Sequence, residues 1–193
     1  ALYYDDFSDG LRYWSVTDYE GVGTWTSRTT ESNPPTSSGN PHIGYGFRED
    51  QVLTYWFEGE AHSVLESPVI DLKEVQDAHL FIHHNFGFGG EAGSCGGVVQ
   101  ARSETDRWIT LTPDLPHTKP LQRGKSGPME GEHAFQGGRE WYQIGFDLDE
   151  FTGGLTMIWF IVSSGSSGSG WGWSIDDFFV SSSGFDPSDT QPP

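Results

Sequence analysis

Residues 170–180 read Gly170-Trp171-Gly172-Trp173-Ser174-Ile175-Asp176-Asp177-Phe178-Phe179-Val180. Aromatic and β-branched residues favour a strand, but the adjacent carboxylates of Asp176 and Asp177 interrupt the apolar pattern. Burying an uncompensated carboxylate is costly or forces it to take up a proton. Successive strand residues point to opposite faces, so both aspartates cannot simply face water unless a bulge intervenes. At least one of them must bind a cation, cap backbone amides or pair with an arginine.

A second acidic pair, Asp5 and Asp6, lies at the other end of the chain, directly before an aromatic residue. If the first and last strands are neighbours, these carboxylates converge with Asp176 and Asp177. Calcium prefers six to eight oxygen ligands, and loop carbonyls can supplement carboxylates. We therefore predict a structural Ca²⁺ ion that clamps the two chain ends. The alternative is that the protein itself caps these aspartates.

Composition limits the kinds of partner. The 193-residue chain has 10 basic and 28 acidic residues and a net charge of −18, which disfavours nucleic acids and anionic membranes. The only cysteine, Cys95, excludes an internal disulfide, and we interpret it as a small buried residue. The sequence contains no apolar run long enough to cross a membrane. We expect a monomer that binds cations or neutral partners.

Strand patterns dominate the middle of the chain. Residues 142–148 alternate between apolar and polar types, and residues 155–162 are apolar on both faces, as in a central strand. Short helical turns are predicted only over 71–78 and 147–151. The predicted class is an all-β, two-sheet antiparallel β-sandwich of the jelly-roll, concanavalin-like or galactose-binding-like type. Further strands are predicted over 52–57, 64–72, 78–86, 97–102 and 108–111.

Loop and linker signals define the domain. Residues 29–40 and 112–138 are rich in Pro, Gly and charged residues, as in long loops. The second loop contains Lys119, Arg123 and Lys125, and it is either a mobile solvated insert or an anchor for an acidic partner. Residues 181–193 have the Ser/Pro/Asp composition of an interdomain linker. We predict a domain over 1–181 and a C-terminal linker over 182–193, with neighbouring domains in the same chain.

The sequence gives little support for catalysis. His83 and His84 are adjacent, so on a strand they point to opposite faces and cannot bind one ion. No H-E-x-x-H or Gly-x-Ser-x-Gly motif occurs in a suitable context. A glycosidase-like pair such as Glu58 and Glu60 stays open, because sequence does not give the separation of two carboxylates. We predict that the chain is not an enzyme.

The chain is unusually rich in aromatic residues, with eight Trp and seven Tyr. Most tryptophans are expected in the core, but an exposed aromatic ring can stack on the flat face of a sugar. Four aromatic residues lie beside predicted loops and are our candidate ligand-binding platforms. They are Trp25, Tyr45, Trp56 and Trp171.

Five segments, in order, carry a resemblance to a known family. These are Asp6-Phe7-Ser8-Asp9-Gly10 followed by Trp14; Ser63 to Leu72; Gly96-Gly97-Val98-Val99 with Ser103 and Trp108; Trp141 with Phe146 to Gly153; and Trp173 to Phe178. From residue 5 to residue 180 the pattern resembles the jelly-roll family that includes MAM-like domains and the accessory domains of secreted bacterial metallopeptidases of the immune inhibitor A type. The chain departs from the family at Cys95, where an Asp is usual, and at residues 104–107, which replace an Asp-Gly turn.

The resemblance implies paired terminal strands and structural calcium near Asp6 and near Asp176 or Asp177. With the aromatic residues, it implies a non-catalytic, calcium-stabilised module that recognises carbohydrate or a cell surface. Such a module would belong to a secreted or cell-surface bacterial multidomain protein, attached to a peptidase or another hydrolase. The alternative is a structural spacer or adhesion-stalk domain that binds only calcium and neighbouring domains. A processing or chaperone-like appendage of a peptidase is a third interpretation.

Overall fold

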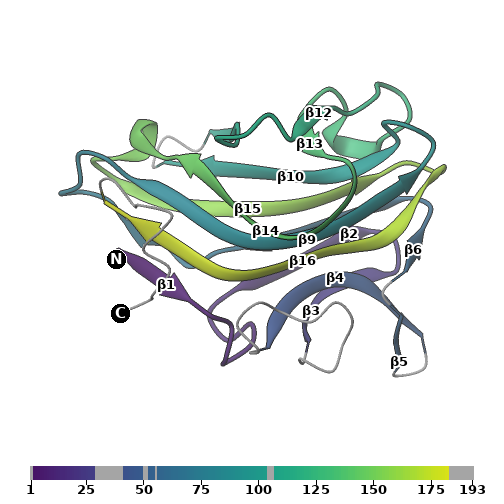
Figure 1. Ribbon diagram of the computed structural model, residues 1–193, viewed down its shortest axis with the longest axis horizontal. Helices are drawn as coiled ribbons and strands as arrows, with labels where there is room; N and C mark the ends of the chain where they lie inside the picture. The colour runs from purple at the N-terminus through teal and green to yellow at the C-terminus, as the bar shows by residue number, and fades with distance from the viewer. Residues whose placement is uncertain (1, 29–40, 50–51, 55, 104–106, 183–193) are drawn as a thin grey trace.

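The computed structural model describes residues 2–28, 41–49, 52–54, 56–103 and 107–182. Two antiparallel sheets pack face to face and form a β-sandwich, as predicted (Figure 1). Among the described residues, no helix is long and apolar enough to span a bilayer. The predicted linker, apart from residue 182, and the predicted loop over 29–40 lie outside the described residues.

The first sheet, here called sheet A, has the strand order β14-β9-β16-β4-β3. Short strands β1 and β6 also pair with β16, and β5 pairs with β4. The bounds are β1 (Tyr3–Asp5), β3 (Gly23–Arg28), β4 (His42–Glu49), β5 (Val52–Thr54), β6 (Phe57–Glu58), β9 (His79–Gly90), β14 (Gly137–Asp147) and β16 (Gly168–Ser181).

The second sheet, sheet B, has the order β12-β13-β10-β15-β7-β2, with β11 beside β10 and β8 beside β15. Its strands are β2 (Ser15–Glu20), β7 (Ala61–Glu66), β8 (Ile70–Asp71), β10 (Cys95–Arg102), β11 (Trp108–Thr110), β12 (Thr118–Pro120), β13 (His133–Phe135) and β15 (Leu155–Ser164). Two single 3₁₀ turns, η1 (Gly127–Met129) and η2 (Asp149–Phe151), complete the described elements.

Most sequence predictions of strands are confirmed, with instructive differences. The strand predicted over 64–72 is divided into β7 and β8 because Pro68, which has no N–H, follows Ser67. The Ser67 hydroxyl accepts the Ile158 N–H at 2.9 Å and so replaces a lost ladder bond. The predicted helical turn over 147–151 is confirmed by η2, whereas residues 71–78 form turns rather than a helix.

Aromatic residues fill the space between the sheets. Trp173, on β16, is completely buried and contacts rings from both sheets, including Phe160 at 5.6 Å between centroids and Trp25 at 5.9 Å. A Cβ atom at Gly97, on β10, would lie 2.6 Å from Cε3 of Trp173, so β10 can approach the indole only because residue 97 is glycine. Cys95 is buried, as predicted.

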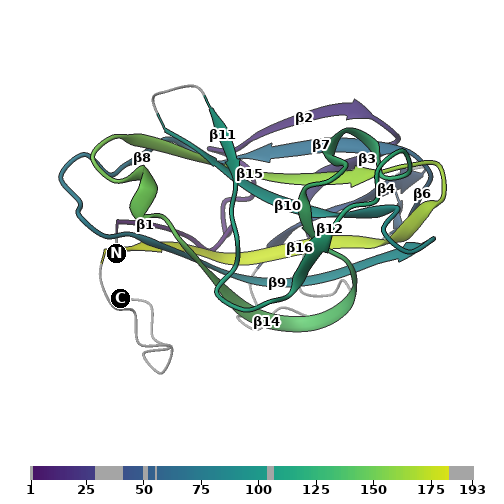
Figure 2. The same ribbon diagram turned by 90° about the horizontal axis from the view of Figure 1, so that it is seen from above.

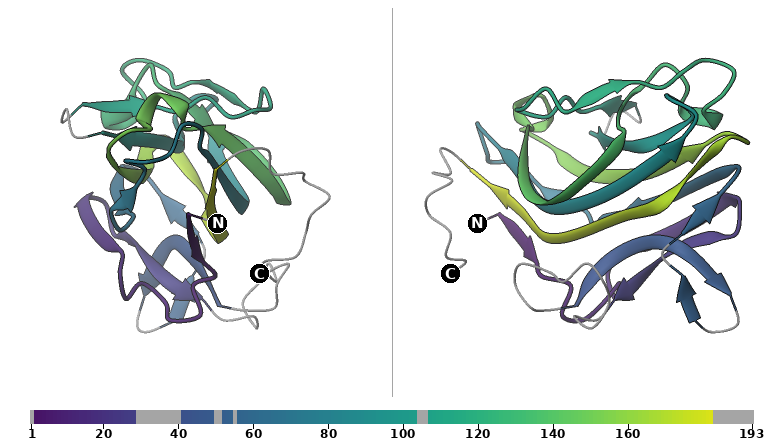
Figure 3. Two further views of the ribbon diagram at one scale, coloured as in Figure 1. Left: turned by 90° about the vertical axis from the view of Figure 1, so that its left-hand side faces the viewer. Right: turned by 45° about the vertical axis from the view of Figure 1, so that its right-hand side comes forward.

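The predicted loop over 112–138 is in fact a covering layer. It contains η1 and the sheet B strands β12 and β13, and it folds over the outer side of sheet B, away from sheet A (Figures 1 and 3). Leu121 and Ala134 from this layer pack with Val64, Val98 and Ile161 in a second apolar cluster. This layer buries Ile161 on the outer face of β15, whereas Leu155, Met157 and Trp159 on the same face stay partly exposed. The interpretation as a mobile insert is therefore wrong for this region.

The chain ends pair, as the predicted clamp requires. β1 lies antiparallel to the end of β16, with Tyr3 opposite Val180 and Asp5 opposite Phe178, at one end of the sandwich (Figure 2). The register of β16 against β9 shifts between Asp176 and Phe179, and Asp177 has a φ of 49°. This irregularity is a β-bulge. It allows the two adjacent aspartate side chains not to point to opposite faces of the strand.

Candidate functional site

The acidic residues at the start of the chain accept protein hydrogen bonds. Asp5 Oδ1 accepts the Phe7 N–H and Asp5 Oδ2 accepts the Trp14 indole N–H, both at 2.8 Å. Asp6 Oδ1 accepts the Ser8 N–H at 3.0 Å. These contacts match the capping alternative, in which the protein itself satisfies the carboxylates.

Asp176 and Asp177 occupy different environments. Asp176 is completely buried, and its Oδ1 accepts the Asp177 N–H at 2.9 Å. Asp177 Oδ1 accepts the Tyr4 hydroxyl at 3.1 Å, and its Oδ2 lies 3.9 Å from His83 Nδ1. Partial burial and the neighbouring Asp177 carboxylate raise the pKa of the Tyr4 phenol. The two carboxylates therefore have different surroundings, with Asp176 buried against the sheet and Asp177 near Tyr4 of β1.

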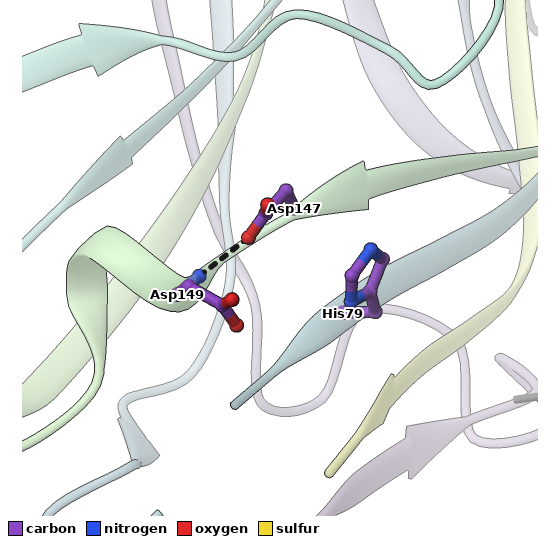
Figure 4. Close-up of side chains that lie close together, drawn as sticks. All are labelled: His79, Asp147 and Asp149. Carbon is purple, nitrogen blue, oxygen red and sulfur yellow. Dashed lines mark hydrogen bonds between the residues drawn. The ribbon is translucent and has the colours of Figure 1, made fainter. Parts of the chain in front are cut away.

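One group of described side chains brings three potential metal ligands within 4.8 Å of one another: His79, Asp147 and Asp149 (Figure 4). His79 and Asp147 are register partners on β9 and β14, and Asp149 begins η2. Asp147 Oδ1 accepts the Asp149 N–H at 2.7 Å, and Asp149 Oδ1 accepts the Ala78 N–H at 2.9 Å. These hydrogen bonds from backbone N–H groups explain the positions of the exposed Asp147 and Asp149 carboxylates. An imidazole with two carboxylates also suits a transition metal better than calcium.

Sequence reasoning missed this group, because His79 reaches Asp147 only through the register of β9 and β14. The four aspartates predicted to bind calcium do not meet the same three-ligand condition among the described residues.

A larger constellation covers the outward side of sheet A, the side that faces away from the sandwich interior. Cross-strand register places Asn85 beside Ser174, and His83 beside Asp176. On the neighbouring strands, Arg28 is opposite His42. We call this set, with Trp141 of β14, the outer-face cluster. Its members are Arg28, His42, His83, Asn85, Trp141, Ser174 and Asp176.

Arg28 is held flat against the sheet. A Cβ atom at Gly44 would lie 2.3 Å from Arg28 Nε, so the guanidinium crosses β4 where the side chain is absent. Arg28 Nη1 donates to Ser174 Oγ at 3.1 Å, and Nη2 donates to the Tyr45 carbonyl at 2.7 Å. The guanidinium is therefore directed along the sheet rather than into solvent.

Three aromatic rings meet above the middle of the sheet. The Trp141 ring lies 5.3 Å from the His42 ring and 5.9 Å from the His83 ring. Strands β9 and β16 lie between β14 and β4, and adjacent strands are about 4.8 Å apart. The Trp141 and His42 side chains must therefore reach toward each other across β9 and β16.

Several polar atoms of this cluster are buried without a hydrogen-bond partner among the described residues. They are Asn85 Nδ2 and Oδ1, His42 Nδ1 and Nε2, and Trp141 Nε1. Burial, and secondarily the Arg28 charge, lower the pKa of His42 to about 4, so its imidazole is neutral at neutral pH. A buried polar group without a partner costs about 1–3 kcal/mol, and such groups are rare in native structures. Five of them on one sheet face indicate a ligand site or bound water.

Trp171 borders the same face. A Cβ atom at Gly87 of β9 would fall 1.8 Å from Trp171 Nε1, so the half-buried indole lies directly on the Gly87 backbone. Trp56 is 55 % exposed and lies next to β6. The structure thus places two of the four predicted platforms where a ligand can reach them.

Trp25 and Tyr45 have a different position. Both are buried in the interior, 2 % and 0 % exposed, with their rings 5.8 Å apart. Neither presents a ring face to a ligand, because both occupy inward positions of β3 and β4. Trp141, which was not among the predicted platforms, is half-buried on the outward side of sheet A. The alternation of side-chain direction along β14 could have indicated this position, because it places Trp141 on the same face as the polar residue Gln143.

A separate cleft of about 460 Å³ lies between residues 88–93 and the segment from β12 to β14. Its lining includes Phe88, Glu91, His117, Lys119 and Gln136. Lys125 pairs with Glu91, and His117 Nδ1 lies 3.2 Å from the Tyr142 hydroxyl oxygen. This cleft is distinct from the outer-face cluster and provides a second location against which a ligand can be tested.

No family model matches the chain, and no curated protein matches its sequence. Solved structures do share its fold. The structure of TmCBM61 in complex with beta-1,4-galactotriose is 11 % identical with a TM-score of 0.55, covering 92 % of this chain and 94 % of that one. The K3 cleaved adhesin domain of Lys-gingipain from Porphyromonas gingivalis is 15 % identical with a TM-score of 0.54, covering 94 % and 99 %.

A xylan-binding domain of family CBM 22 is 11 % identical with a TM-score of 0.50, covering 95 % of this chain and 96 % of that one. At these identities the similarity establishes the fold alone. The chain has the β-sandwich fold found in carbohydrate-binding modules and in adhesin domains.

Proposed function

We propose that this chain is a non-catalytic carbohydrate-binding module whose ligand site is the outward side of sheet A. The observation that carries the proposal is the outer-face cluster, where unpartnered polar atoms lie beside the half-buried indole of Trp141. Sugars present hydroxyl groups at their edges and apolar C–H groups on their ring faces. A site for them needs hydrogen-bonding groups together with an aromatic ring.

The solved structures support this proposal. Among the proteins with this fold are a module in complex with beta-1,4-galactotriose and a xylan-binding domain. The adhesin domain of Lys-gingipain with the same fold favours a secreted, multidomain setting, which we include in the proposal. Attachment to a peptidase or another hydrolase fits the same setting.

Trp171→Ala tests the glycan site. Because the indole lies on Gly87 at the edge of the outer-face cluster, its loss should weaken binding at least about tenfold, or roughly 1.4 kcal/mol. The measurement is affinity electrophoresis on a panel of neutral galactan, xylan and mixed-linkage glucan, followed by calorimetry with the best ligand. Trp108→Ala is the matched control, since Trp108 lies on β11 of sheet B, away from the outward side of sheet A. A loss in Trp108→Ala alone would move the site to sheet B, and no binding to any polysaccharide would favour the spacer function.

We also propose that calcium stabilises the paired chain ends. In support, the pairing of β1 with β16 brings Asp5 and Asp6 to the strand that carries Asp176 and Asp177. Their side chains alone do not supply three clustered ligands, so backbone carbonyls would have to complete a site.

The calcium proposal predicts a calcium-specific rise in the thermal unfolding midpoint, compared with magnesium and EDTA at equal ionic strength. At a hundredfold excess over Kd, the rise should be roughly 5–10 °C. Asp6→Asn and Asp177→Asn should abolish it, while Glu74→Gln, an exposed residue away from the strand ends, should not. A rise that persists unchanged in both aspartate variants contradicts the proposed ligands.

A further inference from the structure

We infer that the outer-face cluster selects an uncharged sugar by its hydroxyl groups, and that Asn85 and His42 are the residues that determine this specificity. This inference rests on the proposed function and specifies its ligand class. It follows from the unpartnered atoms, from the charges around them and from the position of Trp141.

The unpartnered atoms include both donors and acceptors. Asn85 offers an amide NH₂ and a carbonyl oxygen, neutral His42 offers one donor and one acceptor nitrogen, and the Trp141 indole offers a donor. A hydroxyl group donates and accepts, so hydroxyl groups can satisfy all of these atoms. A carboxylate or sulfate only accepts and would leave the Asn85 carbonyl and one His42 nitrogen unpaired. An ammonium group only donates and would leave the donors unpaired.

The charges on this face also disfavour anionic sugars. Asp176 is completely buried in the cluster, and Asp177 follows it with its carboxylate near His83. The Arg28 guanidinium is directed along the sheet, toward Ser174 and the Tyr45 carbonyl. The chain as a whole carries a net charge of −18. An acidic sugar would have to approach a protein with a net charge of −18, which is unfavourable.

The fluorescence of Trp141 should report ligand binding. Asn85 and His42 are completely buried, whereas Trp141 is only half-buried and lies against both His42 and His83. A sugar that reaches His42 must therefore contact or displace the Trp141 indole. Binding should change the tryptophan fluorescence of the wild-type protein, and Trp141→Phe should lose most of that change.

Asn85→Leu separates recognition from folding. The Asn85 amide has no partner among the described residues, so an apolar residue of similar size removes an unsatisfied group. We expect the variant to unfold at the same or a higher urea concentration than wild type and to bind neutral oligosaccharides at least tenfold more weakly. His42→Phe, which keeps a ring but removes both nitrogens, should behave in the same way. Lys119→Met, in the separate cleft, is the control and should bind like wild type.

The ligands are galacto- and xylo-oligosaccharides as neutral sugars, oligogalacturonate as the acidic series and chitosan oligosaccharides as the cationic series. Preference for the neutral series, lost in both variants, supports the inference. Tight binding of the acidic or cationic series, or neutral binding unchanged in Asn85→Leu and His42→Phe, overturns it. If Asn85→Leu is less stable than wild type yet binds sugars normally, Asn85 holds structural water rather than a ligand. This result would also overturn the inference. Failure of every glycan to bind would instead reject the proposed function.

Discussion

Replacing Trp173 with alanine should lower the free energy of unfolding by about 3–5 kcal/mol, which is the cost of removing a large buried aromatic side chain. Trp173 is completely buried, and its ring lies about 6 Å or less from Phe135 of β13 and Phe160 of β15 on the opposite sheet. Its indole N–H also donates to His84 Nδ1 at 3.2 Å. The variant loses contacts to both sheets and leaves a cavity between them.

Urea unfolding followed by far-ultraviolet circular dichroism measures this effect, with the slope against urea checked for two-state behaviour. Trp56→Ala is the control, because Trp56 is 55 % exposed and its loss should cost no more than about 0.5 kcal/mol. Gly97→Val should destabilise as well, since its side chain would collide with the Trp173 ring. Similar stabilities for Trp173→Ala and Trp56→Ala would contradict the placement of Trp173 in the core.

The sequence predicts this fold well where one strand carries its own pattern. Residues 155–162 indicate a central strand because apolar residues occupy both faces, and β15 does lie between β10 and β7. The paired aspartates 176 and 177 require a bulge, a ligand or caps, and the structure has the bulge. In contrast, β2, β3 and β4 were not predicted, because their polar and glycine residues do not give a clear alternation. Residues 112–138 look like a solvated loop by composition, and only tertiary packing of Leu121 and Ala134 reveals a covering layer.

The candidate site was much harder to predict. His42, Asn85 and Trp141 lie on three different strands and meet only through cross-strand register. No local motif marks such residues, because each reads as an ordinary strand residue within its own segment. Trp171, Trp25 and Tyr45 all lie beside predicted loops, but Trp25 and Tyr45 point inward. Whether an aromatic residue near a loop faces the solvent or the core depends on the direction of its side chain, and composition does not give that direction.

Acid should destabilise the folded protein through its buried histidines. Burial lowers the pKa of His42 to about 4 and lowers that of His84 well below its ordinary value. Between the ordinary value of 6.5 and these lowered values, the unfolded chain binds protons that the folded protein does not. Stability is therefore fully present above pH 6.5 and decreases as the pH falls toward about 4. Each of these histidines contributes up to about 1.4 kcal/mol per pH unit.

Urea unfolding at about pH 7, 6 and 5 should thus show a combined loss of roughly 2–3 kcal/mol per pH unit in the lower interval. His42→Phe should reduce this slope by up to about 1.4 kcal/mol per pH unit, because one of the two most strongly buried imidazoles no longer titrates on unfolding. Burial also lowers the pKa values of His62, His83 and His117, which retain their part of the slope. His133→Gln is the matched control, since His133 is exposed on β13 and should leave the slope unchanged. If His42→Phe and wild type lose stability equally between pH 6 and 5, protonation of carboxylates rather than of buried histidines governs the acid response. A reduced slope in His42→Phe would also show that the His42 imidazole is neutral in the folded protein, the state in which it offers both a donor and an acceptor to hydroxyl groups.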